Sequence, residues 1–177
     1  AGTAAKTKRY EAPKAQNAPK AVVGEAVTGE DLAPLELPKK ETPKAESKTR
    51  SVQEIYQEGL DAFNAKKYDA AEDDFELILK DYPKDKLAGN AQYWLGEVYF
   101  SRNDFAKAAV AFGKGYKNYK DGNKGADSMY KLGVAMQRLG KNAEACAAYQ
   151  SLPSEFPKAE KALLDKAKKA AQTLKCK

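Results

Sequence analysis

The 177-residue sequence has no histidine, two cysteines, one tryptophan and no long apolar run. Without histidine there is no imidazole to act as a general base near neutral pH or to bind zinc. Two cysteines are too few for a four-thiolate metal site. No apolar stretch approaches the roughly 18 residues of a membrane-spanning helix, so membrane insertion is not expected. No glycine-rich phosphate loop opens a helix, and we expect no enzymatic activity, cofactor or metal.

The positive charge is modest and evenly divided. Lys and Arg number 31 and Asp and Glu 25, which gives a net charge of +6. Residues 1–50 contribute +3 and residues 51–177 contribute the other +3. Nucleic-acid binding requires basic charge gathered in one region, so nucleic acid is not an expected partner.

Apolar residues are concentrated in the C-terminal part of the chain. Residues 1–50 hold five of the eight prolines and a single aromatic residue, Tyr10. Such a segment cannot bury enough apolar surface to offset the entropy of ordering it, so we predict a disordered Ala/Pro/Lys-rich linker. The chain begins Ala1-Gly2-Thr3, which is typical of a processed or truncated product, so any export signal is expected upstream.

An internal repeat with a period of 37 residues organises the rest of the chain. Three glycines mark the period, and each has a tyrosine three residues before it, an alanine twelve after it and an aromatic residue sixteen after it. Such a period predicts a stack of identical helix pairs. The positions expected to pack the repeats are Gly59, Ala71, Phe75, Gly96, Ala108, Phe112, Gly133, Ala145 and Tyr149.

Apolar residues at helical spacing predict two antiparallel helices in each copy. The first helix is expected over 52–65, 88–101 and 125–139, and the second over 68–81, 105–119 and 142–151. A glycine inside a helix costs about 1 kcal/mol relative to alanine, so the three glycines need a tertiary reason. We expect each glycine to let the two helices approach closely at the facing alanine.

A last amphipathic helix, at about 158–174, follows Pro157 and carries many lysines. A stack of repeats leaves its final apolar face bare, and a helix with a charged outer side covers it. The sequence therefore predicts an all-α chain with three repeats over 51–157 and a capping helix over 158–177. The lysines are expected to keep the cap in water, with contact to an anionic surface as the alternative.

The repeat resembles the tetratricopeptide repeat in the spacing of its Leu, Gly, Tyr, Ala, Phe and Pro positions. Each copy has 37 residues, three more than the usual 34. The run NAQYWLGEVY at 90–99 further resembles the C-terminal domain of the Tol-Pal-associated cell division coordinators, the CpoB or YbgF family. The run DSMYKLG at 127–133, followed by Glu144-Ala145-Cys146, resembles alphaproteobacterial members of that family.

This resemblance implies a non-enzymatic periplasmic protein that binds the inner-membrane protein TolA. It also implies association with a peptidoglycan synthase complex, which would link septal peptidoglycan synthesis to outer-membrane constriction. Members of the family carry an N-terminal trimerising coiled coil that this sequence lacks, so the oligomeric state is left open. The repeats depart from the pattern at Glu58, Lys120, Gly113 and Gly115. The alternative is a structural tetratricopeptide scaffold in another envelope or secretion complex.

The first helices of such repeats line a concave face. Positions three before, one after and four after each glycine share one stripe. Tyrosines beside amide and guanidinium groups suit an extended or helical peptide, and the alternative is that the tyrosines only pack between neighbouring first helices. Trp94 suits packing as well as it suits ligand contact. The predicted partner-binding groove consists of Tyr56, Phe63, Asn64, Asn90, Tyr93, Glu97, Phe100, Tyr130, Gln137 and Arg138.

The two cysteines form a candidate disulfide. Cys146 falls on the last repeat helix and Cys176 at the end of the cap, so a bond between them is feasible in an oxidising compartment. Closing that loop is worth about 3–4 kcal/mol in the chain-entropy treatment. In the alternative, Cys146 is a buried small apolar residue and Cys176 a free thiol.

Overall fold

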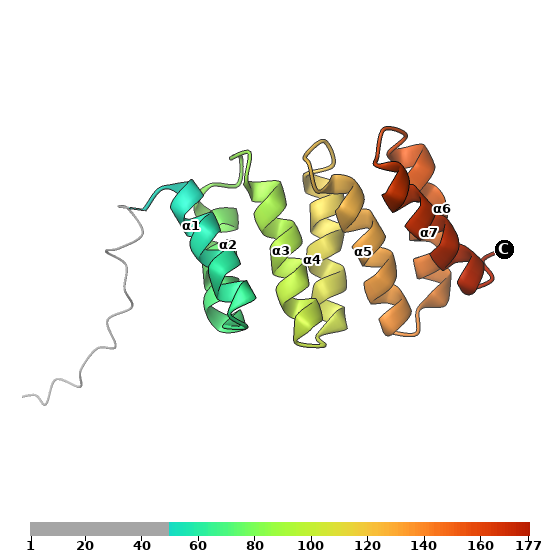
Figure 1. Ribbon diagram of the computed structural model, residues 1–177, viewed down its shortest axis with the longest axis horizontal. Coiled ribbons are helices and arrows are strands. Elements are labelled where there is room, and N and C mark those ends of the chain that lie inside the picture. The colour runs from blue at the N-terminus through green and yellow to red at the C-terminus, as the bar shows by residue number, and fades with distance from the viewer. Residues whose placement is uncertain (1–49) are drawn as a thin grey trace, which may run out of the picture. The chain divides into compact units, whose positions relative to one another are not determined.

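The computed structural model describes residues 50–177, so the predicted linker lies, except for Arg50, outside the described residues. The described part is all-α, as predicted, and its helices form successive antiparallel pairs (Figure 1). The helices α1, α3 and α5 form one layer, and α2, α4 and α6 the other (Figure 1). The seven helices of this part are α1 Val52–Asn64, α2 Tyr68–Asp81, α3 Ala88–Ser101, α4 Phe105–Asn118, α5 Gly125–Arg138, α6 Asn142–Glu155 and α7 Lys161–Thr173.

Local signals in the sequence account for several helix ends. Ser51 and Glu54 form a capping box at the start of α1, in which the Ser51 Oγ accepts a hydrogen bond from the Glu54 N–H at 3.2 Å. Between the two helices of each pair, one residue with positive φ ends the first helix. These residues are Lys66, Asn103 and Gly140, 37 positions apart. The residue after each one donates its N–H to the carbonyl five residues back, which closes the same left-handed turn in all three copies.

The three repeat glycines do allow a close approach, but the prediction that alanine faces them was wrong. A Cβ atom added to Gly96 would lie 2.5 Å from the ring of Phe112, which is fully buried. The equivalent distances are 2.8 Å from Gly59 to Phe75 and 2.6 Å from Gly133 to Tyr149. The backbone of the first helix therefore lies against the aromatic ring sixteen residues later. The alanines Ala71, Ala108 and Ala145 are fully buried beside these contacts.

The helix α6 continues to Glu155, four residues beyond the predicted end at 151. Pro153 lies inside its last turn and lacks the N–H that would complete the hydrogen-bonding pattern. The apolar residues around it stabilise this extra turn, because Leu152 is fully buried and Phe156 packs against the same core cluster. Burial of these side chains outweighs the missing hydrogen bond.

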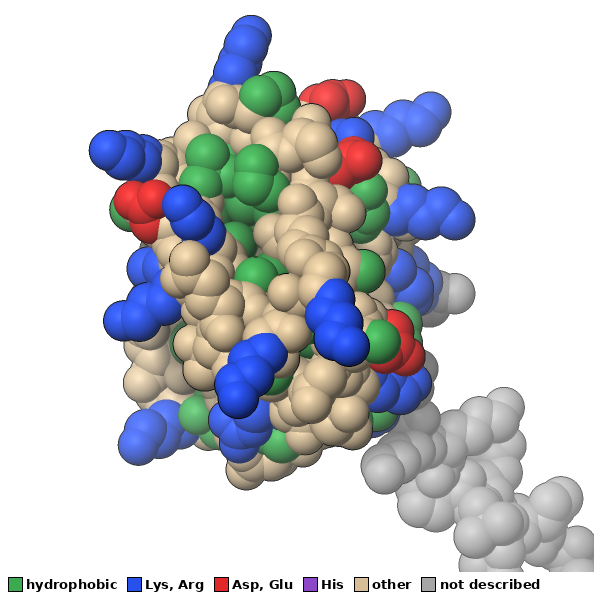
Figure 2. All heavy atoms as spheres, turned by 90° about the vertical axis from the view of Figure 1, so that its right-hand side faces the viewer, with side chains coloured by type: hydrophobic (Ala, Val, Ile, Leu, Met, Phe, Trp, Pro, Cys, Tyr) green, Lys and Arg blue, Asp and Glu red, His purple; other side chains and the backbone are tan. Residues whose placement is uncertain are grey.

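The helix α7 occupies the place predicted for the cap and packs mainly against α6. Its buried residue is Ala167, and Leu163, Leu164 and Leu174 are partly buried in the same cluster. Its lysines are exposed, and lysine side chains project around this end of the molecule (Figure 2). The helix therefore covers the last repeat with one face and presents charge on the other.

Candidate functional site

The predicted partner-binding residues all lie on α1, α3 and α5, and we call their surface the helix-A face. Asn64, Gln137 and Arg138 are exposed, and the other seven are partly buried. The ten residues line none of the three described cavities, whose volumes are about 830, 450 and 300 Å³. The helix-A face therefore exposes polar side chains to solvent, while its aromatic side chains are partly buried against other parts of the fold.

Aromatic side chains join α1 to α3. The indole Nε1–H of Trp94 donates a hydrogen bond to the Tyr56 hydroxyl at 2.9 Å. The ring of Phe63 meets Trp94 edge to face, with 5.2 Å between centroids, and Tyr93 meets it at 5.7 Å. Burial raises the pKa of the Tyr56 phenol, so this group stays protonated at neutral pH. Trp94 thus gathers the predicted residues of α1 and α3 into one cluster.

Cations and rings join α3 to α5. The Lys131 ammonium lies 2.7 Å from a Glu97 carboxylate oxygen and 4.8 Å from the centroid of Phe100. The Arg138 guanidinium lies 4.4 Å from the centroid of Phe105 and 5.7 Å from that of Phe100. A cation over an aromatic face is attracted by the ring quadrupole. The predicted Glu97, Phe100 and Arg138 therefore lie together around a lysine that the sequence prediction did not include.

Tyr93 lies between the buried core and the lysines of the α3–α5 interface. Its ring packs against Phe112, with 5.7 Å between centroids, and the Lys124 ammonium lies 5.0 Å from the Tyr93 centroid. Burial raises the pKa of the Tyr93 phenol well above its usual range, and the negative charges of Glu97 and Asp127 raise it further. The phenol remains a neutral group that can donate and accept hydrogen bonds.

The remaining predicted residues are dispersed. Tyr130 packs against Tyr149 at 5.7 Å between centroids, and the Tyr149 hydroxyl donates to the Gln137 Oε1 at 3.2 Å. Burial raises the pKa of Tyr149 to about 12. Asn64 is the exposed last residue of α1, and Asn90 is partly buried in the first turn of α3. These side chains do not form one cluster with Glu97 and Arg138.

Sequence reasoning missed Lys124, Lys131 and Phe105 and left the role of Trp94 open. One period before these lysines stand Leu87 and Trp94, so the repeat pattern did not separate the two lysines from the others of the chain. The single tryptophan was a usable signal. Its contacts with Tyr56, Phe63 and Tyr93 place it at the centre of the α1–α3 seam.

Cys146 on α6 and Cys176 beyond α7 form a disulfide, with 5.5 Å between their Cα atoms. The bond ties the last helix to the last repeat. Within residues 50–177, no helix is long and apolar enough to cross a membrane. In the same described residues, no three His, Cys, Asp or Glu side chains are grouped as metal ligands would be.

Sequence models of the tetratricopeptide repeat match residues 56–123 and 127–159. Two curated sequences from Pseudomonas putida, each a cell division coordinator CpoB, are 43% identical to this chain over 49 residues. That segment covers 28% of this chain and 18% of each relative, so the match spans less than a fifth of their length.

Two solved structures share the fold at low sequence identity. PcrH from Pseudomonas aeruginosa is 17% identical with a TM-score of 0.59, over 71% of this chain and 92% of its own. The N-terminal domain of stress-induced protein-1 from C. elegans is 19% identical with a TM-score of 0.57, over 67% of this chain and 93% of its own. These similarities concern the arrangement of helices alone.

Proposed function

Residues 56–123 and 127–159 are tetratricopeptide repeats, and from this we propose that the chain is a non-enzymatic module that binds a protein partner through the helix-A face. The observation that carries the proposal is the exposed Arg138 guanidinium beside Phe105 and Phe100. A guanidinium ordered against rings can donate to a backbone carbonyl or a carboxylate with little further loss of side-chain entropy. Exposed Gln137 adds an amide at the same end of α5.

The finer proposal is that the partner is TolA in the periplasm. In this role the chain would act with the Tol-Pal system and a peptidoglycan synthase complex to coordinate septal synthesis with outer-membrane constriction. Its support is the similarity to the CpoB sequences of Pseudomonas putida. The disulfide between Cys146 and Cys176 supports an oxidising compartment, because such bonds persist outside the reducing cytosol.

The test is a titration of a purified TolA fragment against the full chain and a Gln137→Ala/Arg138→Ala variant. Removing both exposed groups is expected to weaken binding about tenfold, the equivalent of about 1.4 kcal/mol. Lys117→Ala is the matched control, because this exposed lysine lies on α4, away from the helix-A face. Equal affinities for all three proteins would place the binding site elsewhere.

Tyr93 requires a milder substitution than alanine. Its ring packs against the fully buried Phe112, so Tyr93→Ala would leave a cavity and destabilise the fold together with the surface. Tyr93→Phe keeps the ring and removes only the hydroxyl. If a folded wild-type chain shows no affinity for TolA, the alternative function is favoured, in which the chain is a structural scaffold in another envelope or secretion complex.

A further inference from the structure

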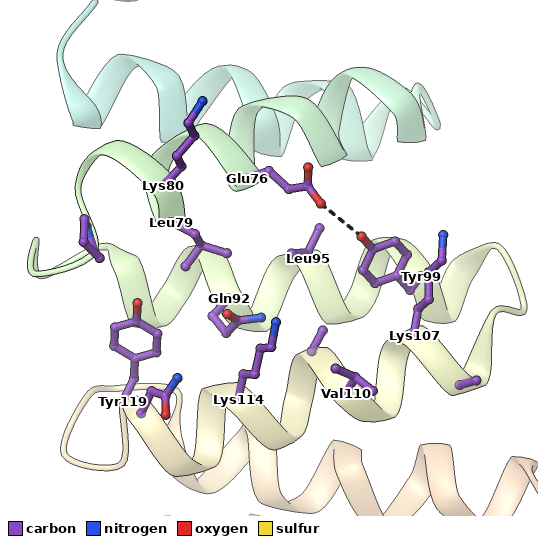
Figure 3. Close-up of a pocket in the computed structure, with 14 residues that line it drawn as sticks. Glu76, Leu79, Lys80, Gln92, Leu95, Tyr99, Lys107, Val110, Lys114 and Tyr119 are labelled. Carbon is purple, nitrogen blue, oxygen red and sulfur yellow. Dashed lines mark hydrogen bonds between the residues drawn. The ribbon is translucent and has the colours of Figure 1, made fainter.

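A concave surface lies between α2 and α4, with α3 as its floor (Figure 3). We call it the α2–α4 groove, and its volume is about 830 Å³. It shares no residue with the helix-A face. Three residues of α3 line the groove: Gln92, Leu95 and Tyr99. They lie on another side of the helix from Tyr93 and Glu97.

The floor and one wall of the groove are apolar. Leu95 is 7% exposed and Ala111 3% exposed, and Leu79 on α2 is partly buried. Val110 on α4 is 59% exposed, more than any other large apolar side chain of the described residues. An exposed valine beside a concave apolar floor provides a place for the apolar side chains of a partner.

Positive charge dominates the rim. Lys80 on α2 and Lys114 on α4 rise from opposite sides of the groove (Figure 3). In the described part of the chain, no carboxylate lies within 4.0 Å of either ammonium group. The acidic residue of the lining, Glu76, accepts a hydrogen bond from the Tyr99 hydroxyl at 3.3 Å. The rim therefore offers two cations for carboxylates from outside the fold.

Polar groups lie at the end of the groove nearest Tyr119. Gln92 is only 5% exposed, and its side-chain amide is directed toward the groove (Figure 3). Asn118 and Tyr119 line the same end. An amide and a phenol can pair with the backbone of an extended peptide and so fix its register.

The length of the groove indicates a peptide. Its lining on α4 runs from Ala106 to Tyr119, which corresponds to about 20 Å at the rise of an α-helix. An extended segment of about six residues has this length. We propose that the α2–α4 groove binds an extended segment of a partner protein in which leucine-like side chains alternate with carboxylates. This site goes beyond the proposed function, because it shares no residue with the helix-A face and does not require TolA.

The proposal is tested on an array of octapeptides in which every position is Leu, Ala, Glu or Lys, probed with the labelled full chain. Peptides with at least two Leu and two Glu are expected to bind at least tenfold more strongly than poly-Ala. Val110→Glu should remove this binding. Lys80→Glu/Lys114→Glu should shift the preference to peptides with Leu and Lys, because the rim then carries the opposite charge.

Lys66→Glu/Lys117→Glu changes the net charge equally at exposed lysines outside the groove, so it should keep the wild-type preference. The Gln137→Ala/Arg138→Ala variant should also bind the peptides normally, which separates this proposal from the helix-A face. No enrichment over poly-Ala, or an equal shift in the control variant, would overturn the proposal. It would also be overturned if wild-type chain sediments as a dimer that Val110→Glu dissociates and peptides do not, because a second copy would then be the occupant.

Discussion

The interface between α2 and α3 and the interface between α4 and α5 occupy equivalent places in the 37-residue repeat but differ in chemistry. In the first, Arg102 forms ion pairs with Asp69 and Glu72, and the Tyr99 hydroxyl donates to Glu72 at 2.8 Å. Shifting these four positions by the 37-residue period gives Leu139, Ala106, Ala109 and Met136. A charged network in one interface is thus replaced by apolar side chains in the next.

The two ends of the described chain differ in a second way. The core shared by α1 to α4 contains large side chains such as Phe75, Phe112 and Ile78. The core of α5 to α7 also contains a large side chain, Tyr149, but it has fewer buried residues, and the disulfide ties the C-terminal segment to α6 beside it. The glycine–ring contact and the turns therefore recur in every repeat, while each interface is stabilised by different side chains.

The disulfide provides the largest expected difference between the two regions. Cys146→Ser/Cys176→Ser should lower the free energy of unfolding by about 3–4 kcal/mol, because the open chain regains the entropy lost in a loop with a sequence separation of 30. Hydrogen exchange should accelerate in α6 and α7 and remain unchanged in α1 to α4. Uniform acceleration through all seven helices would contradict the division into two regions.

The glycine–ring contact tests what the regions share. Gly96→Ala should destabilise the chain by about 3 kcal/mol, since the new methyl group would overlap the buried Phe112 ring. Gly133→Ala should cost a similar amount against Tyr149. Gly113, also within a helix, has nothing within 4 Å of an added Cβ, so Gly113→Ala should stabilise by about 1 kcal/mol. Urea unfolding measures all three, and equal effects would refute the steric explanation.

The charged interface gives the smallest expected effect. Arg102→Leu introduces the residue found one period later and should cost about 1 kcal/mol, because the Asp69 partner is almost fully exposed and Glu72 keeps the hydrogen bond from the Tyr99 hydroxyl. The loss measured by thermal unfolding should shrink in 1 M salt, which screens exposed charges. A loss that persists unchanged in high salt would show that Arg102 acts through packing.

The sequence predicted the helices because glycine, tyrosine and aromatic positions recur at one period. It did not predict which residue meets the glycine, since alanine and the aromatic lie on the same side of the second helix, four residues apart, and only the assembled pair shows which one reaches it. It placed the end of α6 too early, because burial of Leu152 outweighs the local cost of Pro153. Lys131 escaped prediction because it acts across helices and because Trp94, not a lysine, stands one period earlier. Arg138 was predicted, but its position over the Phe105 ring was not.

The recurrence of the left-handed turn at Lys66, Asn103 and Gly140 makes the 37-residue segment a unit of growth. A duplicated segment would contain its own turn, glycine and aromatic ring. The added helix pair could therefore pack into the stack without substitutions in the neighbouring repeats. The terminal disulfide limits where this can happen, because Cys146 on α6 and Cys176 just beyond α7 must stay close together. Insertion between existing repeats, upstream of α6, is the route by which a longer relative of this chain could arise.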